Sequence, residues 1–478
     1  MIRRTFVALL MAGLITASPG RAETAAESIG GDARPDVLLI VVDDLNTDLG
    51  YLGGPVHTPH LDRLAARGMV FTDAHCNAPV CNPSRTSFLL GQYPPTTGVL
   101  DNDTHFRHRP ATRSAVTLPQ AFRQHGYLSV AAGKIFHNGW KPPTHPHAHF
   151  ADLEHSWDRY EPLGVGTPEP PRVERDWHRG RLNTWMKGSF LWGGITQPLE
   201  DTDDFRNAAA IARQLEATEP GGQPRFLACG IFRPHLPFFA PQRFFDLYPP
   251  QDPPSLPGVL ESDLDDLPPT ALAWARKTGV HGPLVAEHRW GEAVAAYRAA
   301  TSFADACVGR VLDALDASPR RDRTYVVLIS DHGFQLGEKQ AWAKFTFWDR
   351  VTRVPMIIAG PGITPGRCDA PVSLVDLYPT LLSLAGLPPR DDLAGRDLTA
   401  LLREPRRDWD HPVYVFHQDP QNQAVIDASY RYIRYADGGE ELYDRAADPH
   451  DWHNLAGQAE HAPTLEDYRR KRWTPAAR

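Results

Sequence analysis

The sequence has no concentration of basic residues and no long apolar run after its first residues. Its 50 Lys and Arg residues are outnumbered by 58 Asp and Glu residues, and the net charge of −8 gives no reason to expect nucleic acid as a partner. No later segment has the roughly 18 consecutive apolar residues of a membrane span, so we expect none in the mature protein. Internal repeats and low-complexity tracts are also absent.

Cysteine is scarce. Cysteines of exported proteins tend to pair, and an odd number leaves at least one without a partner in the chain. If Cys81 is that one, the other four allow three pairings or none. A disulfide between Cys76 and Cys81 is the structural alternative to a functional Cys81. The five cysteines are Cys76, Cys81, Cys229, Cys307 and Cys368.

The first residues are typical of an export signal. Arg3 and Arg4 form a charged start, residues 6–17 are mostly apolar, and small residues lie near position 22. We interpret residues 1–22 as a signal peptide and residues 23–35, which are polar and small, as a linker. This interpretation predicts a periplasmic or secreted protein.

Apolar runs and helical patterns alternate over residues 36–400, which predicts one large α/β domain with a mainly parallel sheet flanked by helices. The β-branched runs at 36–42 and 324–330 predict buried strands. Residues 138–200 have little periodicity and predict long loops. Further strands are predicted at 70–74, 127–132, 226–231 and 354–359, and helices at 58–68, 86–90, 118–125, 203–217, 291–317 and 374–385.

The pattern changes near residue 401. Short apolar runs at 413–416, 424–426, 430–435 and 441–443 predict antiparallel strands. We interpret residues 401–478 as a smaller C-terminal α/β domain that carries a short antiparallel sheet.

Two predicted buried strands end in adjacent acidic or imidazole groups, Asp43-Asp44 and Asp331-His332. Open α/β sheets place their sites at the carboxyl ends of strands, so these groups should share one crevice. Carboxylates that lie this close repel one another unless a divalent cation binds. Three carboxylates favour Ca²⁺ or Mg²⁺, whereas His332 leaves Mn²⁺ or Zn²⁺ open. For either pair alone, an Asp that caps a helix start is the alternative explanation.

Several motifs, in chain order, resemble those of the type I sulfatase family. The segments 133–137, 233–238 and 330–344 most resemble iduronate-2-sulfatase and its bacterial relatives, and residues 441–456 resemble the family's C-terminal signature. The resemblance spans about residues 35–456 and implies an alkaline-phosphatase-like fold. The motifs are Asp43-Asp44, Cys81-Asn82-Pro83-Ser84-Arg85, Gly133-Lys134 with His137, Asp331-His332-Gly333, and Lys344.

The resemblance implies that a formylglycine-generating enzyme oxidises Cys81 to Cα-formylglycine, whose aldehyde hydrates to a diol. One hydroxyl of the diol attacks the sulfate ester, and loss of the proton from the second hydroxyl then expels sulfate. A thiolate that attacked the sulfate ester would have no second hydroxyl with which to release the sulfate. The resemblance also implies one divalent metal, Ca²⁺ ahead of Mg²⁺ or Mn²⁺. Its ligands would be Asp43, Asp44, residue 81, Asp331 and His332.

The same resemblance implies roles for the remaining residues. Arg85 holds the diol, and Lys134 and Lys344 bind the sulfate. His137 is the base for the second hydroxyl, and His235 is the acid that protonates the leaving oxygen.

Two positions depart from the pattern that is usual in this family. Leu90 stands where Thr is usual, which bears on how efficiently residue 81 is converted. His332 stands where many sulfatases have Asn, as it does in the iduronate-type branch and in phosphonate monoester hydrolases.

The leading hypothesis is an exported sulfatase that acts on a sulfated sugar, such as a 2-O-sulfated uronate in glycosaminoglycan degradation. One alternative is a phosphonate monoester or phosphodiester hydrolase on the same scaffold. Another is a non-catalytic protein that binds sulfated glycans. Trp, His and Arg residues within 138–200 would suit a carbohydrate site, or would only pack a long loop.

Overall fold

A computed structural model describes residues 34–137, 152–161, 190–217 and 222–474. The predicted signal peptide, most of the predicted linker and much of the predicted loop at 138–200 lie outside these residues. No helix in the described part is both long and apolar enough to cross a membrane.

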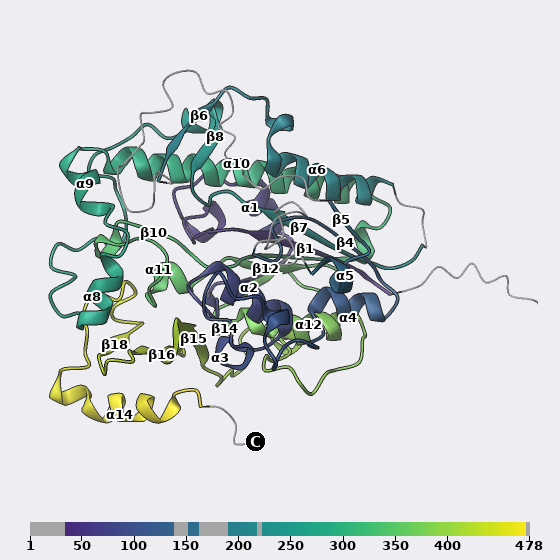
Figure 1. Cartoon of the computed structure of the whole chain (residues 1–478). Coiled ribbons are helices and arrows are strands. Elements are labelled where there is room, and N and C mark those ends of the chain that lie inside the picture. The colour runs from purple at the N-terminus through teal and green to yellow at the C-terminus, as the bar shows by residue number, and fades with distance from the viewer. Residues whose placement is uncertain (1–33, 138–151, 162–189, 218–221, 475–478) are drawn as a thin grey trace, which may run out of the picture.

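The centre of the fold is an eight-stranded sheet of order β13-β2-β12-β9-β1-β7-β4-β5 (Figure 1). Only β12 runs against its neighbours, β9 and β2, and every other pairing in this sheet is parallel. This confirms the predicted mainly parallel α/β sheet. The strands are β1 (Asp36–Val42), β2 (Met69–Phe71), β4 (Leu128–Gly133), β5 (Arg159–Glu161), β7 (Arg225–Ile231), β9 (Thr324–Ser330), β12 (Met356–Ala359) and β13 (Gly366–Cys368).

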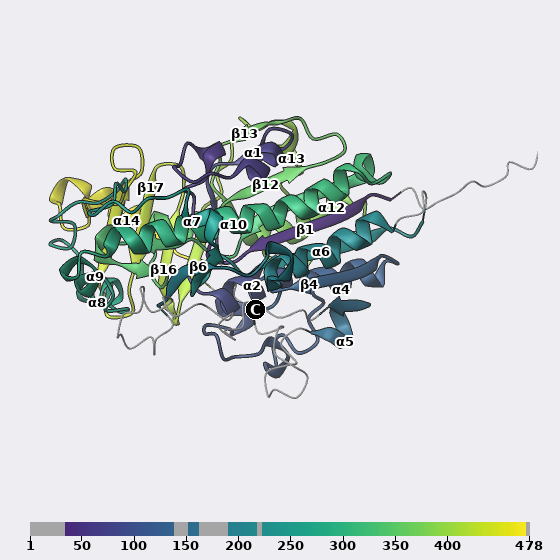
Figure 2. The ribbon, with the colours of Figure 1, turned by 90° about the horizontal axis from the view of Figure 1, so that it is seen from above.

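Helices cover both faces of this sheet (Figures 1 and 2). Along β1, Val37, Leu39 and Val41 join one core, and the alternate residues join the other. A strand buried on both faces needs apolar residues at every position, which explains the continuous run in the sequence. One face carries α1 (Pro59–Ala65), α6 (Asp203–Glu216) and α10 (Trp290–Asp316), and the other carries α2 (Cys81–Leu90), α4 (Leu118–Gln124) and α12 (Leu377–Leu384).

The C-terminal strands form a separate antiparallel sheet of order β15-β16-β17-β18, as predicted. The helix α14 (Ala462–Lys471) packs on it through Leu465 and Tyr468. A domain boundary at residue 400 stays a prediction. The strands are β15 (Val413–His417), β16 (Asp419–Ile426), β17 (Tyr430–Arg434) and β18 (Glu440–Asp444).

Two local expectations need correction, and one alternative is excluded. The helix predicted from residue 86 begins at Cys81, because Pro83 in its first turn lacks only an N–H that needs no partner there. The strand predicted at 70–74 is two short strands, β2 and β3 (Ala74–His75), and β3 pairs with β14 (Val372–Ser373). All five cysteines are buried free thiols, so the alternative Cys76–Cys81 disulfide is absent.

The remaining elements are short and connect these layers. They are α3 (Pro94–Thr97), α5 (Leu153–Ser156), α7 (Gln242–Phe245), α8 (Pro269–Ala275), α9 (His281–Ala286), α11 (Asp349–Thr352), α13 (Thr399–Arg403), β6 (Trp192–Ile195), β8 (Phe238–Pro241), β10 (Gln335–Leu336) and β11 (Trp342–Ala343).

Arg431 of β17 joins the small sheet to the main fold. Its fully buried guanidinium donates to the Phe347 carbonyl at 2.9 Å and to the Asp349 carboxylate at 2.8 Å. It also donates to Asp451 at 3.2 Å. Asp451 therefore pairs with this cation, whereas Asp349 also pairs with Arg353 at 2.7 Å.

We predict that Arg431→Met lowers the free energy of unfolding by about 3–5 kcal/mol, because it leaves the buried Asp451 carboxylate without an ion-pair partner and removes one of the two partners of Asp349. Equilibrium urea denaturation measures the loss. Arg434→Met on the same strand is the control: its partner Glu440 is 3.7 Å away and its side chain is 30% exposed, so the loss should stay under about 1 kcal/mol. Equal losses for the two variants would contradict the assignment.

Candidate active site

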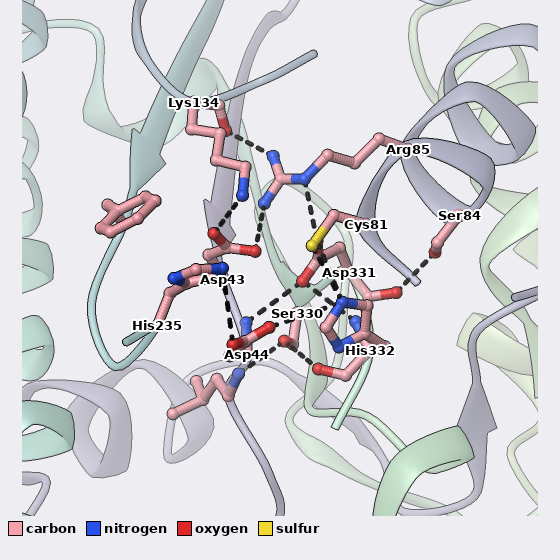
Figure 3. Close-up of polar contacts among 12 residues, drawn as sticks. Asp43, Asp44, Cys81, Ser84, Arg85, Lys134, His235, Ser330, Asp331 and His332 are labelled. Carbon is pink, nitrogen blue, oxygen red and sulfur yellow. Dashed lines mark hydrogen bonds and ion pairs between the residues drawn. The ribbon is translucent and has the colours of Figure 1, made fainter. Parts of the chain in front are cut away.

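The ends of β1 and β9 face the start of α2 (Figure 3). β1 and β9 pair in parallel, so the residues that follow them emerge side by side. Ligand atoms of Asp43, Asp44, Cys81 and His332 all lie within 4.8 Å of one another, and all four residues are buried. Asp331 lies beside this group, since its Oδ2 is 3.7 Å from His332 Nε2. The predicted metal ligands are therefore together in one place.

The orientation of His332 suits a ligand. Its Nδ1 lies 3.0 Å from the Gly333 carbonyl, which leaves Nε2 directed at Cys81 Sγ at 3.3 Å and at Asp44 Oδ1 at 3.5 Å. Burial alone would lower the pKa of His332, but the Asp331 carboxylate raises it to about 9. A cation bound among these carboxylates would take the place of that proton.

The turn after β1 is held by residues from distant parts of the chain. Asp44 has a φ of 59°, a left-handed conformation that needs support in a residue other than glycine. The Tyr297 hydroxyl in α10 donates to the Asp44 carbonyl at 2.8 Å. Ser330 Oγ donates to the His332 carbonyl at 2.7 Å and accepts from the Leu45 N–H at 2.9 Å. No local sequence pattern marks Tyr297 or Ser330 as part of the site.

Arg85 ties the ligand-bearing segments together. Its Nε donates to Asp331 at 2.8 Å and its Nη2 to Asp43 at 3.2 Å. Its Nη1 donates to the carbonyls of Lys134 and Ile135, at 2.5 and 2.9 Å. Arg85 thus positions two carboxylates, and its contact with a diol at residue 81 stays a prediction.

Both predicted sulfate-binding lysines reach the site. Lys344 Nζ lies 2.7 Å from Asp44 Oδ1 and 3.0 Å from Cys81 Sγ. Lys134 Nζ pairs with Asp43 and lies 5.2 Å from the centre of the Phe232 ring. The sequence did not predict this contact between Lys134 and the Phe232 ring.

The two predicted proton-transfer histidines also lie here. His137 is within hydrogen-bonding reach of Cys81, and burial lowers its pKa to about 4, with Lys134 acting in the same direction. His235 Nδ1 lies 2.6 Å from the Leu236 carbonyl, and its Nε2 faces Asp44 Oδ2 at 3.9 Å. About a quarter of the His235 side chain is accessible.

The cations set the protonation of the site. Burial alone would raise the pKa of the Cys81 thiol, but Lys134, Lys344 and then His332 bring it well below its ordinary value. Burial likewise opposes ionisation of Asp43, and Lys134 holds the pKa of that carboxyl low. For Asp331, burial outweighs Arg85 and raises the pKa to about 6. Near pH 7 the carboxylates of Asp43 and Asp331 are therefore available as ligands.

Comparison with known proteins identifies the family. The sulfatase family model matches residues 35–387, and the model of the N-sulphoglucosamine sulphohydrolase C-terminal region matches residues 337–474. A sulfatase of Formosa agariphila is 35% identical over 91% of this chain and 85% of its own length. Human iduronate 2-sulfatase is 33% identical over 81% of this chain and 76% of its own length.

Solved structures agree on the fold. The phosphonate monoester hydrolase of Agrobacterium radiobacter has a TM-score of 0.74 at 22% identity, over 92% of this chain and 94% of that one. A 2-O GAG sulfatase has a TM-score of 0.68 at 23% identity, over 92% and 91%. This chain thus has the alkaline-phosphatase-like fold and belongs to the sulfatase family of sulfuric ester hydrolases, with iduronate 2-sulfatases among its relatives.

Proposed function

We propose that this chain hydrolyses a sulfate ester on a sulfated sugar, with residue 81 as formylglycine and one divalent metal. The observation that carries the proposal is the buried group of Asp43, Asp44, Asp331 and His332 around residue 81. Three carboxylates and one imidazole close to residue 81 fit a divalent cation, Ca²⁺ by the number of carboxylates, with Mg²⁺ or Mn²⁺ as alternatives. When bound, the metal and the formylglycine hydrate would supply an activated hydroxyl and neutralise charge on the sulfate.

Charge balance in the site supports an anionic substrate. Three carboxylates are matched by three cations, Arg85, Lys134 and Lys344, each in direct contact with at least one of them. Their formal charges cancel, so a divalent cation beside neutral His332 leaves a charge of about +2. A sulfate ester, which is negative, is attracted to such a site, and a neutral ester is not.

The chain's own residues divide the remaining work. Lys134 and Lys344 would donate hydrogen bonds to the sulfate oxygens. His137 is neutral near pH 7, because burial lowers its pKa, and it can therefore accept a proton. His235 presents Nε2 towards the site and would protonate the oxygen of the departing sugar.

Sequence similarity supports a sulfate ester over a phosphonate ester, with sulfated saccharides as one substrate class among the relatives beside a choline-sulfatase that is 31% identical. Iduronate 2-sulfatases are relatives, whereas the likeness to the phosphonate monoester hydrolase structure is one of fold alone. The ratio of activities on an aryl sulfate and a phosphonate monoester separates the two. The intact core motif at residues 81–85 supports maturation by a formylglycine-generating enzyme, and the N-terminal pattern supports export to the periplasm or secretion.

We predict that natively matured protein carries an aldehyde at residue 81, detected as a lower mass of the peptide that contains it. Cys81→Ala should then have no measurable turnover of an aryl sulfate while keeping its melting temperature. Cys368→Ala, another buried thiol, is the control and should keep turnover. Turnover by Cys81→Ala, or full activity with an unconverted thiol, would contradict the mechanism.

A second prediction concerns His235. His235→Ala should lower kcat/KM on a sugar sulfate by about 10²- to 10⁴-fold, the usual contribution of a general acid. The loss on nitrophenyl sulfate should be far smaller, because nitrophenolate leaves without a proton. His288→Ala, whose side chain is 88% exposed, should change neither value. An equal loss on both substrates would exclude His235 as the acid.

A further inference from the structure

Next to the proposed sulfate site lies a group of four side chains that the reaction does not use: Trp274, Lys277, Phe345 and His417, here called the cation–aromatic cluster. Phe345 directly follows Lys344, whose Nζ is 3.0 Å from Cys81 Sγ. Its backbone N–H donates to the Pro79 carbonyl at 3.2 Å, close to the start of α2. The cluster therefore adjoins residue 81 rather than lying on a remote face.

Lys277 is a partly buried cation without a counter-charge. Its Nζ lies 4.1 Å from the centre of the Phe345 ring, and no carboxylate in the described part of the chain pairs with it. Burial accordingly lowers the pKa of Lys277, and no acidic group raises it again. By contrast, Lys134 and Lys344 each contact an aspartate. A desolvated ammonium of this kind is stabilised when an anion binds beside it.

His417 supplies a second unused polar group. It ends β15, is 3% exposed, and packs its ring 4.8 Å from Trp274 and 6.1 Å from Phe345. Within the described residues neither ring nitrogen has a hydrogen-bond partner. Burial, with Lys277 second, lowers its pKa to about 3, so near pH 7 the neutral ring offers one donor and one acceptor. Buried polar atoms are normally paired, so a missing partner points to a ligand.

We propose that Lys277 and His417 form a subsite for a second anionic group of the substrate, a carboxylate or a second sulfate, on the sugar that presents its sulfate ester to residue 81. This inference rests on the proposed function and narrows the substrate to a sugar with at least two anions. Phe345, which carries the Lys277 ammonium over its ring, and Trp274, which packs against His417, would line this subsite. A sulfate ester that carries a cation would be repelled by Lys277.

The test compares sulfated sugars that differ by one group, using matured full-length protein. A 2-O-sulfated uronate and the 2-O-sulfated hexose that lacks its carboxylate form one pair, and a disulfated and a monosulfated glucosamine form the other. Lys277→Met should lower kcat/KM about 10- to 100-fold on the doubly anionic member of at least one pair, the loss expected for a charge-assisted hydrogen bond. The change should lie mainly in KM, because this contact is made equally in the bound ground state.

Controls separate the subsite from the catalytic site. Nitrophenyl sulfate has no second anion, so Lys277→Met should hydrolyse it at an unchanged rate. Lys277→Arg keeps the positive charge and should retain the preference for the doubly anionic sugar. Arg276→Met removes the same charge from the exposed neighbouring residue and should change nothing. The pair that responds identifies the second anion as carboxylate or sulfate. An equal change, or no change, in kcat/KM on all substrates for Lys277→Met would overturn the subsite. If the wild-type protein turned over no sulfate ester at all, the proposed function would fail and the subsite with it.

Discussion

The structure depends on burying six charges in one place. A buried charge without a partner costs several kcal/mol. The carboxylates therefore need the cations, and the cations need the carboxylates. The carboxylates are Asp43, Asp44 and Asp331, and the cations are Arg85, Lys134 and Lys344. The pKa shifts express this mutual dependence. Lys134 holds the pKa of the Asp43 carboxyl low, and the same lysine and Lys344 depress that of the Cys81 thiol. The arrangement is poised to accept a cation and an anion together.

The rest of the fold keeps these charges in position. Parallel pairing of β1 and β9 places two acidic strand ends side by side, and α2 directs its first residue at them. Tyr297 of α10 supports the left-handed turn at Asp44 by donating a hydrogen bond to its carbonyl. The small C-terminal sheet contributes through Arg431, which fixes the segment that follows Lys344. Through His417 this sheet also reaches the cation–aromatic cluster.

Local patterns were sufficient to predict the frame of the site. The apolar run before Asp43 and the one before Asp331 each end at the sheet edge where parallel strands deliver their side chains, so the two ligand pairs could be predicted together. The role of Tyr297 could not be predicted, since it lies 253 residues from Asp44 in sequence and within an ordinary helical pattern. Lys277 and His417 also lack a local signature. Among the described residues Lys277 has no carboxylate partner and the His417 ring nitrogens have no hydrogen-bond partner. Only tertiary packing determines this.

The central claim is that these buried charges bind one divalent cation beside residue 81. A crystal structure of natively matured protein, with anomalous scattering to locate and identify the metal, tests it most directly. We expect a single ion bonded to Asp43, Asp44, Asp331 and His332, with residue 81 completing its coordination. We also expect Lys134 and Lys344 to be displaced towards bound sulfate. A fully active crystal form in which these lysines still neutralise the carboxylates and no ion lies between them would contradict it.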